Sequence, residues 1–165
     1  MKNIHHTLYL LIITWVFSYN LLAQSKPTIS FTFDDGSVKD KGGYAFEAWN
    51  ALLLDKLKKA NVKAMLFVRG KGLQNQKGEA LLKSWNNDGH GIANHTFSHP
   101  NYSSSKVTFE QFKNEFLKNE RLIKGYSNYQ KYFRFPYLKE GNTQEKVTAF
   151  RAFLKAQNYK HGYVT

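Results

Sequence analysis

The chain has 165 residues, 42% of them hydrophobic and 22% charged, which fits one folded domain rather than a disordered segment. It contains no cysteine, which excludes disulfide bonds, thiolate metal ligands and a cysteine nucleophile. Any metal must therefore be bound through nitrogen and oxygen. The 24 basic and 12 acidic residues give a net charge of +12, which favours anionic surroundings.

The first 23 residues have the pattern of a secretory signal peptide. Lys2 precedes an apolar run at 8–17, and Ala23 offers a small residue for cleavage. Polar residues at 18 and 20 shorten the run below the roughly 20 residues of a membrane span, so an uncleaved anchor is the weaker alternative. Cleavage removes one lysine and no acid, so the net charge falls from +12 to +11. We expect a secreted, periplasmic or cell-surface protein without a stable membrane span.

Alternating apolar and amphipathic segments predict an α/β fold with a parallel sheet. Strands are expected at 29–33, 64–68, 91–94, 132–135 and 162–164, and helices at 44–60 and 78–87. Thr108 begins a capping-box pattern for a third helix that ends near Gly125, and Asn142 begins a similar pattern for a fourth. Asn61 is expected as a left-handed residue after the first helix.

The first notable motif is Thr32-Phe33-Asp34-Asp35-Gly36, at the end of an apolar run. If the strand continues, Asp34 and Asp35 point to opposite sides, so that one can bind a metal while the other acts as a base. Gly36 then permits a sharp turn. Taken alone, the string is more typical of a surface turn.

His95 and His99 form the second motif. On one helical turn this spacing places both imidazoles on the same face, as in many zinc sites. No glutamate follows His95, so this is not a zinc-protease helix, and Asp34 is the candidate base. The pair alone slightly favours two structural histidines.

The third motif is Arg134-Phe135-Pro136-Tyr137. By itself it is best read as an arginine at a strand end before a proline turn. In the functional interpretation, Arg134 lies near Asp34 and favours its ionised form, while Pro136 fixes the direction of the Tyr137 N–H. All three motifs follow expected strands, at the edge where ligands bind in parallel α/β folds.

Together and in this order, the three motifs resemble the polysaccharide deacetylase family, carbohydrate esterase family four. The resemblance covers Ile29 to about Thr165 and implies a distorted (β/α) barrel, with residues 24–165 forming a deacetylase domain whose C-terminal part is missing. It implies that a divalent metal, usually zinc, is bound by Asp35, His95 and His99. It further implies that Asp34 is the catalytic base, Arg134 orients it, and the Tyr137 N–H stabilises the oxyanion. The implied reaction is hydrolysis of N-acetyl or O-acetyl groups by water that the metal activates.

Two later motifs of the family, an Asp-Trp segment and a Leu-x-His that supplies the general acid, are absent from this sequence. His161 has a different context, and we expect it to be a surface histidine. We therefore expect a fragment of a longer protein, with an incomplete barrel, weak deacetylation and marginal solubility.

The expected partner is an acetylated polysaccharide, and the sequence does not specify an oligomeric state. A catalytically impaired carbohydrate-binding or wall-associated relic of the same fold is the main alternative. Nucleic-acid binding is not expected, although the chain is basic, because the lysines are scattered and no known nucleic-acid motif occurs.

Overall fold

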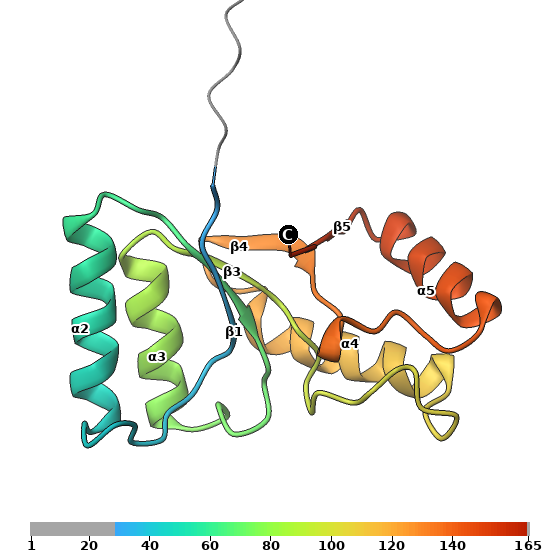
Figure 1. The fold of residues 1–165 in the computed structure, drawn as a ribbon, viewed down its shortest axis with the longest axis horizontal. Helices are drawn as coiled ribbons and strands as arrows, with labels where there is room; N and C mark the ends of the chain where they lie inside the picture. The colour runs from blue at the N-terminus through green and yellow to red at the C-terminus, as the bar shows by residue number, and fades with distance from the viewer. Residues whose placement is uncertain (1–28, 165) are drawn as a thin grey trace, which may run out of the picture.

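A computed structural model describes residues 29–164, which form a curved parallel sheet covered by helices (Figure 1). Each strand pairs with the next one in the chain, in the order β1-β2-β3-β4-β5. The strands are β1 (Thr32–Asp35), β2 (Met65–Val68), β3 (Gly91–Asn94), β4 (Tyr129–Phe133) and β5 (Lys160–His161). The helices are α2 (Phe46–Lys59), α3 (Gln76–Asn87), α4 (Phe109–Ile123), α5 (Gln144–Ala156) and the short 3₁₀ helix η2 (Pro136–Leu138). Within residues 29–164, β1 and β5 do not pair, so the barrel is open.

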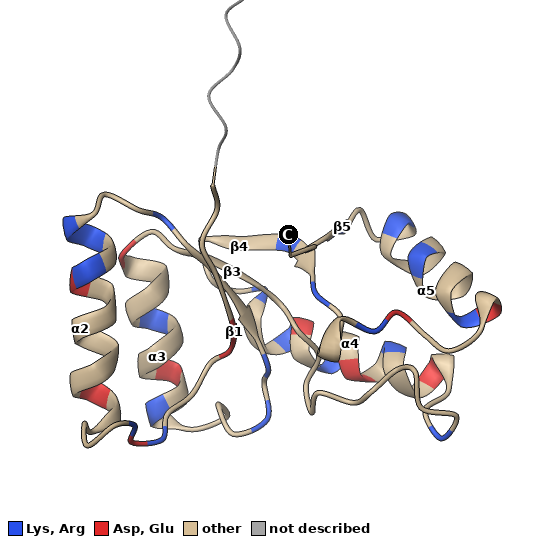
Figure 2. Ribbon diagram, viewed as in Figure 1, with Lys and Arg blue, Asp and Glu red and all other residues tan. Residues whose placement is uncertain are grey.

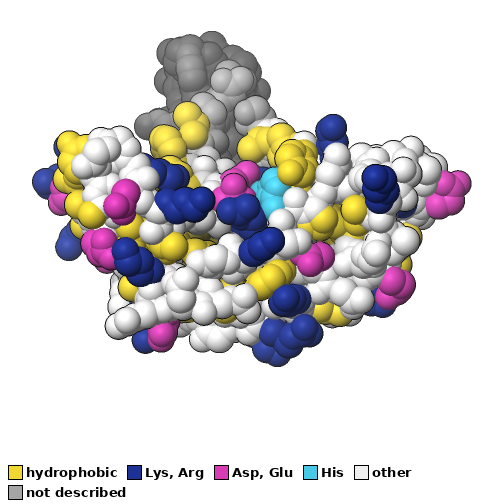
Figure 3. All heavy atoms as spheres, turned by 90° about the horizontal axis from the view of Figure 1, so that it is seen from below, with side chains coloured by type: hydrophobic (Ala, Val, Ile, Leu, Met, Phe, Trp, Pro, Cys, Tyr) yellow, Lys and Arg dark blue, Asp and Glu magenta, His cyan; other side chains and the backbone are white. Residues whose placement is uncertain are grey.

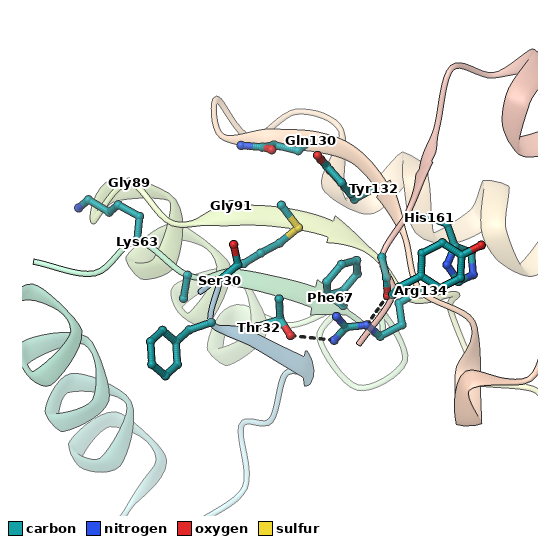
Figure 4. A pocket seen from close by; sticks show the side chains of 15 residues that line it. Ser30, Thr32, Lys63, Phe67, Gly89, Gly91, Gln130, Tyr132, Arg134 and His161 are labelled. Carbon is teal, nitrogen blue, oxygen red and sulfur yellow. Dashed lines mark hydrogen bonds between the residues drawn. The ribbon is translucent and has the colours of Figure 1, made fainter. Parts of the chain in front are cut away.

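The two faces of the sheet have different surroundings. Leu66 and Val68 of β2 are buried in a core shared with α2 and α3, whereas Met65 and Phe67 line a concave cavity of about 450 Å³ (Figure 4). This alternation follows from the twofold periodicity of a strand. Burial of each large apolar side chain contributes about 1.5–3 kcal/mol, so α2 and α3 are firmly attached to one half of the sheet.

A second core, rich in aromatic side chains, attaches α4 and α5 to β4. Its fully buried rings include Phe112, Phe116, Phe133, Phe135 and Phe150. The ring centroids of Phe112 and Phe135 are 5.9 Å apart with an interplanar angle of 7°, and those of Phe112 and Phe150 are 4.8 Å apart in an edge-to-face arrangement. Because Phe135 belongs to this core, the chain that leaves β4 is held rigidly at the strand end.

A buried amide pair joins α4 to the ends of β2 and β3. Asn119 Nδ2 donates to the carbonyl of Val68 at 2.7 Å and to Asn94 Oδ1 at 2.9 Å. Asn94 Oδ1 also accepts from the N–H of Thr96 at 2.9 Å. Both asparagines are fully buried, so these bonds determine the direction in which the chain leaves β3.

The expected elements are all present, with differences at their ends. The strand at 91–94 and the capping box of Thr108 and Gln111 are confirmed, and Asn61 is left-handed, as expected (φ 53°). The strand predicted at 29–33 begins at Thr32, because pairing with β2 begins with Thr32 opposite Met65.

Three predicted boundaries in the C-terminal part were wrong. The fourth helix is capped by Thr143 rather than Asn142, since the Thr143 side chain accepts from the N–H of Lys146. The strand predicted at 132–135 is β4, which ends at Phe133. The strand predicted at 162–164 is β5 at 160–161; Gly162 then donates its N–H to the Phe133 carbonyl, and its own carbonyl accepts from a side chain of the site described below.

The signal peptide expected at 1–23 lies outside the described residues. Across residues 29–164, no helix has the length and hydrophobicity required to span a bilayer.

The substitution Asn119→Ala should lower the free energy of unfolding by roughly 1–3 kcal/mol, because it removes two buried hydrogen bonds, to the Val68 carbonyl and to Asn94 Oδ1. Chemical denaturation measures the change. Asn114→Ala, on the exposed side of the same helix, is the matched control and should leave stability nearly unchanged. Equal effects of the two substitutions would contradict a structural role for the amide pair.

Candidate active site

The three motifs meet at the edge of the sheet where the parallel strands end. Asp34 and Asp35 end β1, His95 directly follows β3, and Arg134 directly follows β4. Viewed from this edge, a histidine and an acidic side chain lie together near the centre of the face (Figure 3). The convergence agrees with the general position of ligand sites in parallel α/β folds.

Asp35, His95 and His99 form a cluster of three potential metal ligands. One ligand atom from each lies within 4.8 Å of the other two, and the centroids of the two imidazole rings are 4.9 Å apart. The Oδ1 atom of Asp35 is buried and has no hydrogen-bond partner within the described part of the chain. Two imidazole nitrogens and a carboxylate oxygen form a donor set that suits zinc and related divalent ions. The cluster expected from the resemblance is therefore assembled.

The surroundings of His95 favour the neutral imidazole, the form that binds metal. Burial lowers the pKa of His95, and this effect outweighs the opposing effects of the Arg134 carbonyl and the Asp34 carboxylate. Nδ1 lies 2.7 Å from the carbonyl oxygen of Arg134. A proton on Nδ1 can therefore be donated to that carbonyl, which leaves Nε2 free for the cluster.

The expected helical turn between His95 and His99 is wrong, because these residues form an irregular loop after β3. Thr96 and His99 both have a φ of 64°, in the left-handed region. Hydrogen bonds hold this backbone: the N–H of Ser98 donates to Glu115 Oε2 at 2.6 Å, and the N–H of His99 to Thr96 Oγ1 at 3.2 Å. The imidazoles approach each other through these bonds and not through helical periodicity.

Asp34 lies next to the cluster and is paired with Arg134. The Asp34 side chain is 40% exposed, whereas that of Arg134 is 2% exposed. Arg134 also donates to Thr32 Oγ1 at 3.1 Å and to the carbonyl of Gly162 at 2.9 Å (Figure 4). Its guanidinium carbon lies 4.0 Å from the centroid of the Phe67 ring. The predicted proximity of Arg134 to Asp34 is thus confirmed, and the carboxylate has a fixed orientation.

The Asp34 carboxylate also faces a cluster residue. Its Oδ2 atom lies 4.0 Å from Nε2 of His95. The Asp34 carboxylate therefore lies between Arg134, which binds Oδ1, and His95, which faces Oδ2.

Tyr137 lies at the rim beside the cluster. Its ring centroid is 4.5 Å from that of His99, and the residue is 59% exposed. Tyr137 and Leu138 have φ angles of 58° and 57°, directly after the buried Pro136. The proline turn expected from sequence thus carries two consecutive left-handed residues that no local signal indicated.

The expectation that His161 is a surface histidine was wrong. Its side chain is 17% exposed, lines the concave cavity with Arg134, and lies with its ring centroid 5.2 Å from that of Phe135. Burial lowers its pKa. His161 is not a member of the ligand cluster, and its Nε2 is 3.7 Å from Glu140.

Sequence reasoning overlooked Arg69, the first residue after β2. Its N–H donates to the carbonyl of Asp35 at 2.9 Å, and its Nε is 3.6 Å from Asp35 Oδ1. Figure 2 shows the acidic end of β1 close to basic positions on the loop after β2. The position of Arg69 could have indicated its role, because the residues of the three motifs end or directly follow a strand, and Arg69 directly follows β2.

The family model described as "Polysaccharide deacetylase" matches residues 22–153. The chain belongs to the polysaccharide deacetylase family. Among curated relatives, the peptidoglycan-N-acetylglucosamine deacetylase of Bacillus cereus is 35% identical over 114 residues, covering 68% of this chain and 37% of that protein. The peptidoglycan-N-acetylglucosamine deacetylase PgdA of Listeria monocytogenes is 30% identical over 101 residues, covering 61% and 19%.

Solved structures of the family share the fold. The crystal structure of the Bc1960 peptidoglycan N-acetylglucosamine deacetylase has a TM-score of 0.61 and 31% identity, covering 80% of this chain and 54% of the other. A family 4 carbohydrate esterase from Streptomyces lividans has a TM-score of 0.64, covering 86% and 65%, and at 21% identity it supports the fold alone. The predicted α/β fold, an incomplete (β/α) barrel, is confirmed. The chain spans between 19% and 65% of the length of these relatives.

Arg134→Met should reduce the free energy of unfolding by about 2–3 kcal/mol, because three acceptors around a buried guanidinium lose their partner. The matched control is Arg151→Met, which breaks the ion pair with Glu140 on the protein surface and should cost about 1 kcal/mol or less. Thermal and denaturant melts of the two variants measure the difference. If Arg134→Met were as stable as Arg151→Met, the buried arginine would not be a structural link.

Proposed function

We propose that the chain is the metal-binding part of a secreted enzyme that removes N-acetyl or O-acetyl groups from a polysaccharide. One observation carries the proposal: the Asp35, His95 and His99 cluster lies beside a carboxylate, Asp34, that a buried arginine holds in place. Membership of the deacetylase family supports the reaction class, and the signal-peptide pattern of residues 1–23 supports secretion. The names of two relatives favour peptidoglycan as the polysaccharide.

The donor set fits a zinc ion. The candidate ligands offer two nitrogens and one oxygen, and Asp35 Oδ1 is a buried acceptor that forms no hydrogen bond within residues 29–164 and could bind a cation. A zinc ion held by Asp35, His95 and His99 would polarise an acetyl carbonyl and lower the pKa of water to about 7.

The roles of the remaining side chains follow from their positions. Asp34 accepts a proton from the attacking water, and Arg134 keeps the carboxylate oriented towards it. The N–H of Tyr137 donates to the acetyl oxygen as negative charge develops there, an interaction typically worth about 2.7–4 kcal/mol. Water adds to the carbonyl carbon, the bond to the sugar nitrogen or oxygen breaks, and acetate leaves while the sugar atom takes up a proton.

The alternative is a catalytically impaired carbohydrate-binding protein with the same fold. This alternative holds if no residue of the complete protein serves as the general acid. Metal and sugar binding would be retained in this case, and acetate release would be lost.

Asp34→Asn should reduce acetate release about 10²–10⁴-fold, because the amide cannot accept the proton. Acetate released from acetylated chito-oligosaccharides and from peptidoglycan is the measurement. Asp40→Asn is the matched control; Asp40 accepts from the N–H of Phe46 at the start of α2, and asparagine caps helices equally well. Unchanged acetate release by Asp34→Asn would refute the assigned base.

His99→Gln should weaken zinc binding by at least tenfold, because one of three ligands is lost. Isothermal titration of the metal-free protein with zinc measures the affinity. The control His161→Gln changes another partly buried histidine outside the cluster and should leave the affinity unchanged. Loss of zinc binding only in the His161 variant would show that the metal site lies elsewhere.

A further inference from the structure

A second cavity, of about 400 Å³, lies beside Asp35 on the side of β1 that faces α2 and α3. Its walls include the apolar side chains of Trp49, Leu53 and Trp85. Its polar lining residues are Asp34, Asp35, Ser37, Lys41 and Arg69. The size and the mixture of aromatic and polar groups are typical of a small-molecule site.

Arg69 lines this cavity, and its guanidinium forms only a loose ion pair with Asp35. Its backbone is fixed by the bond to the Asp35 carbonyl, and its side chain is 38% exposed. The buried Nε has no hydrogen-bond partner among residues 29–164, and at 3.6 Å from Asp35 Oδ1 it is beyond hydrogen-bond distance. A guanidinium has five N–H donors in a planar fork, which suits a carboxylate with two parallel bonds.

Lys41 adds a second positive charge to the lining of the same cavity. Its Nζ lies 5.2 Å from the centroid of the Trp49 ring. Trp49 is fixed in turn, because its Nε1 donates to the Lys39 carbonyl at 3.0 Å. The adjacent acid, Asp40, accepts from the backbone of α2 and does not form an ion pair with Lys41. Figure 3 shows basic side chains close to the histidine and acidic groups of the site.

We infer that this cavity is a subsite for a carboxylate attached to the substrate's sugar chain, so that the substrate is an acidic acetylated polysaccharide. This inference rests on the deacetylase function proposed above. Arg69 would hold the carboxylate through its fork, Lys41 would add electrostatic attraction, and the Trp49 ring would pack against a sugar ring. Asp34 and Asp35 would both repel the bound carboxylate; Arg134, which is paired with Asp34, and a divalent cation on Asp35 would offset this repulsion.

Three disaccharides test the subsite. They are N-acetylglucosamine linked to N-acetylmuramic acid, the methyl ester of that acid, and neutral diacetylchitobiose. Binding to the zinc-loaded protein is followed at low salt by isothermal titration, and acetate release is measured in parallel. The free acid should bind about tenfold more tightly than its ester, a difference typical of a charge-assisted hydrogen bond. This preference should weaken with added salt.

Arg69→Gln should abolish the preference for the acid, and Arg69→Lys should restore part of it, since the charge returns without the fork. Lys58→Gln, in the last turn of α2, is the matched control and should keep the full preference. Equal binding of acid and ester overturns the subsite. An equal loss of affinity for the acid and the ester in Arg69→Gln also overturns the subsite, because it would mean that Arg69 only positions Asp35.

Two further results separate this inference from the proposed function. Acetate release from all three sugars without a preference for the acid overturns the subsite and leaves the deacetylase function standing. Acid-selective binding that depends on Arg69, without acetate release from any sugar, contradicts the proposed reaction and retains the subsite. If N-acetylglucosamine 6-phosphate bound more tightly than the disaccharide that contains N-acetylmuramic acid, the subsite would prefer a phosphate, and the assignment of a carboxylate would be overturned.

Discussion

The buried guanidinium of Arg134 is the interaction on which the geometry of the site depends. It binds Thr32 and Asp34 of β1, packs against Phe67 of β2, and donates to Gly162 just after β5. A buried cation without acceptors is strongly destabilising, so these groups must keep their relative positions. Two of these groups lie in β1 and one follows β5, so Arg134 links the two edge strands of the open sheet and also fixes the orientation of the Asp34 carboxylate.

The ligand cluster depends on a different constraint. Several residues in or beside it have left-handed backbone conformations, which cost free energy unless other contacts stabilise them. Asp35, Thr96 and His99 all have positive φ angles, and a non-glycine residue in that region is strained by about 1–3 kcal/mol. Two hydrogen bonds offset this strain at the loop after β3: the N–H of Thr96 donates to Asn94 Oδ1, and the N–H of Ser98 donates to Glu115 Oε2. The loop is thus rigid before any ligand binds, which favours a pre-organised site.

Local patterns in the sequence predicted the elements, and ordered motifs predicted the site residues. The apolar faces of α2 and α4 and the capping box at Thr108 could be read because periodicity and capping involve only near neighbours. The left-handed loop between His95 and His99 could not be predicted from local sequence, because Glu115, which accepts a hydrogen bond from this loop, belongs to α4. The same reason explains why the burial of His161 was missed: it results from packing against Phe135, 26 positions earlier in the chain.

The proposed metal binding and the proposed turnover would have separate structural origins. The three candidate metal ligands, the candidate base and its arginine end β1 or follow β3 or β4, and contacts within residues 29–164 hold their geometry. A general acid contributes about 10²–10⁴-fold to the rate but little to the position of these groups. Slow acetate release together with intact zinc binding would therefore agree with this arrangement. Loss of metal affinity in a folded chain would not, because the described residues already supply every member of the cluster.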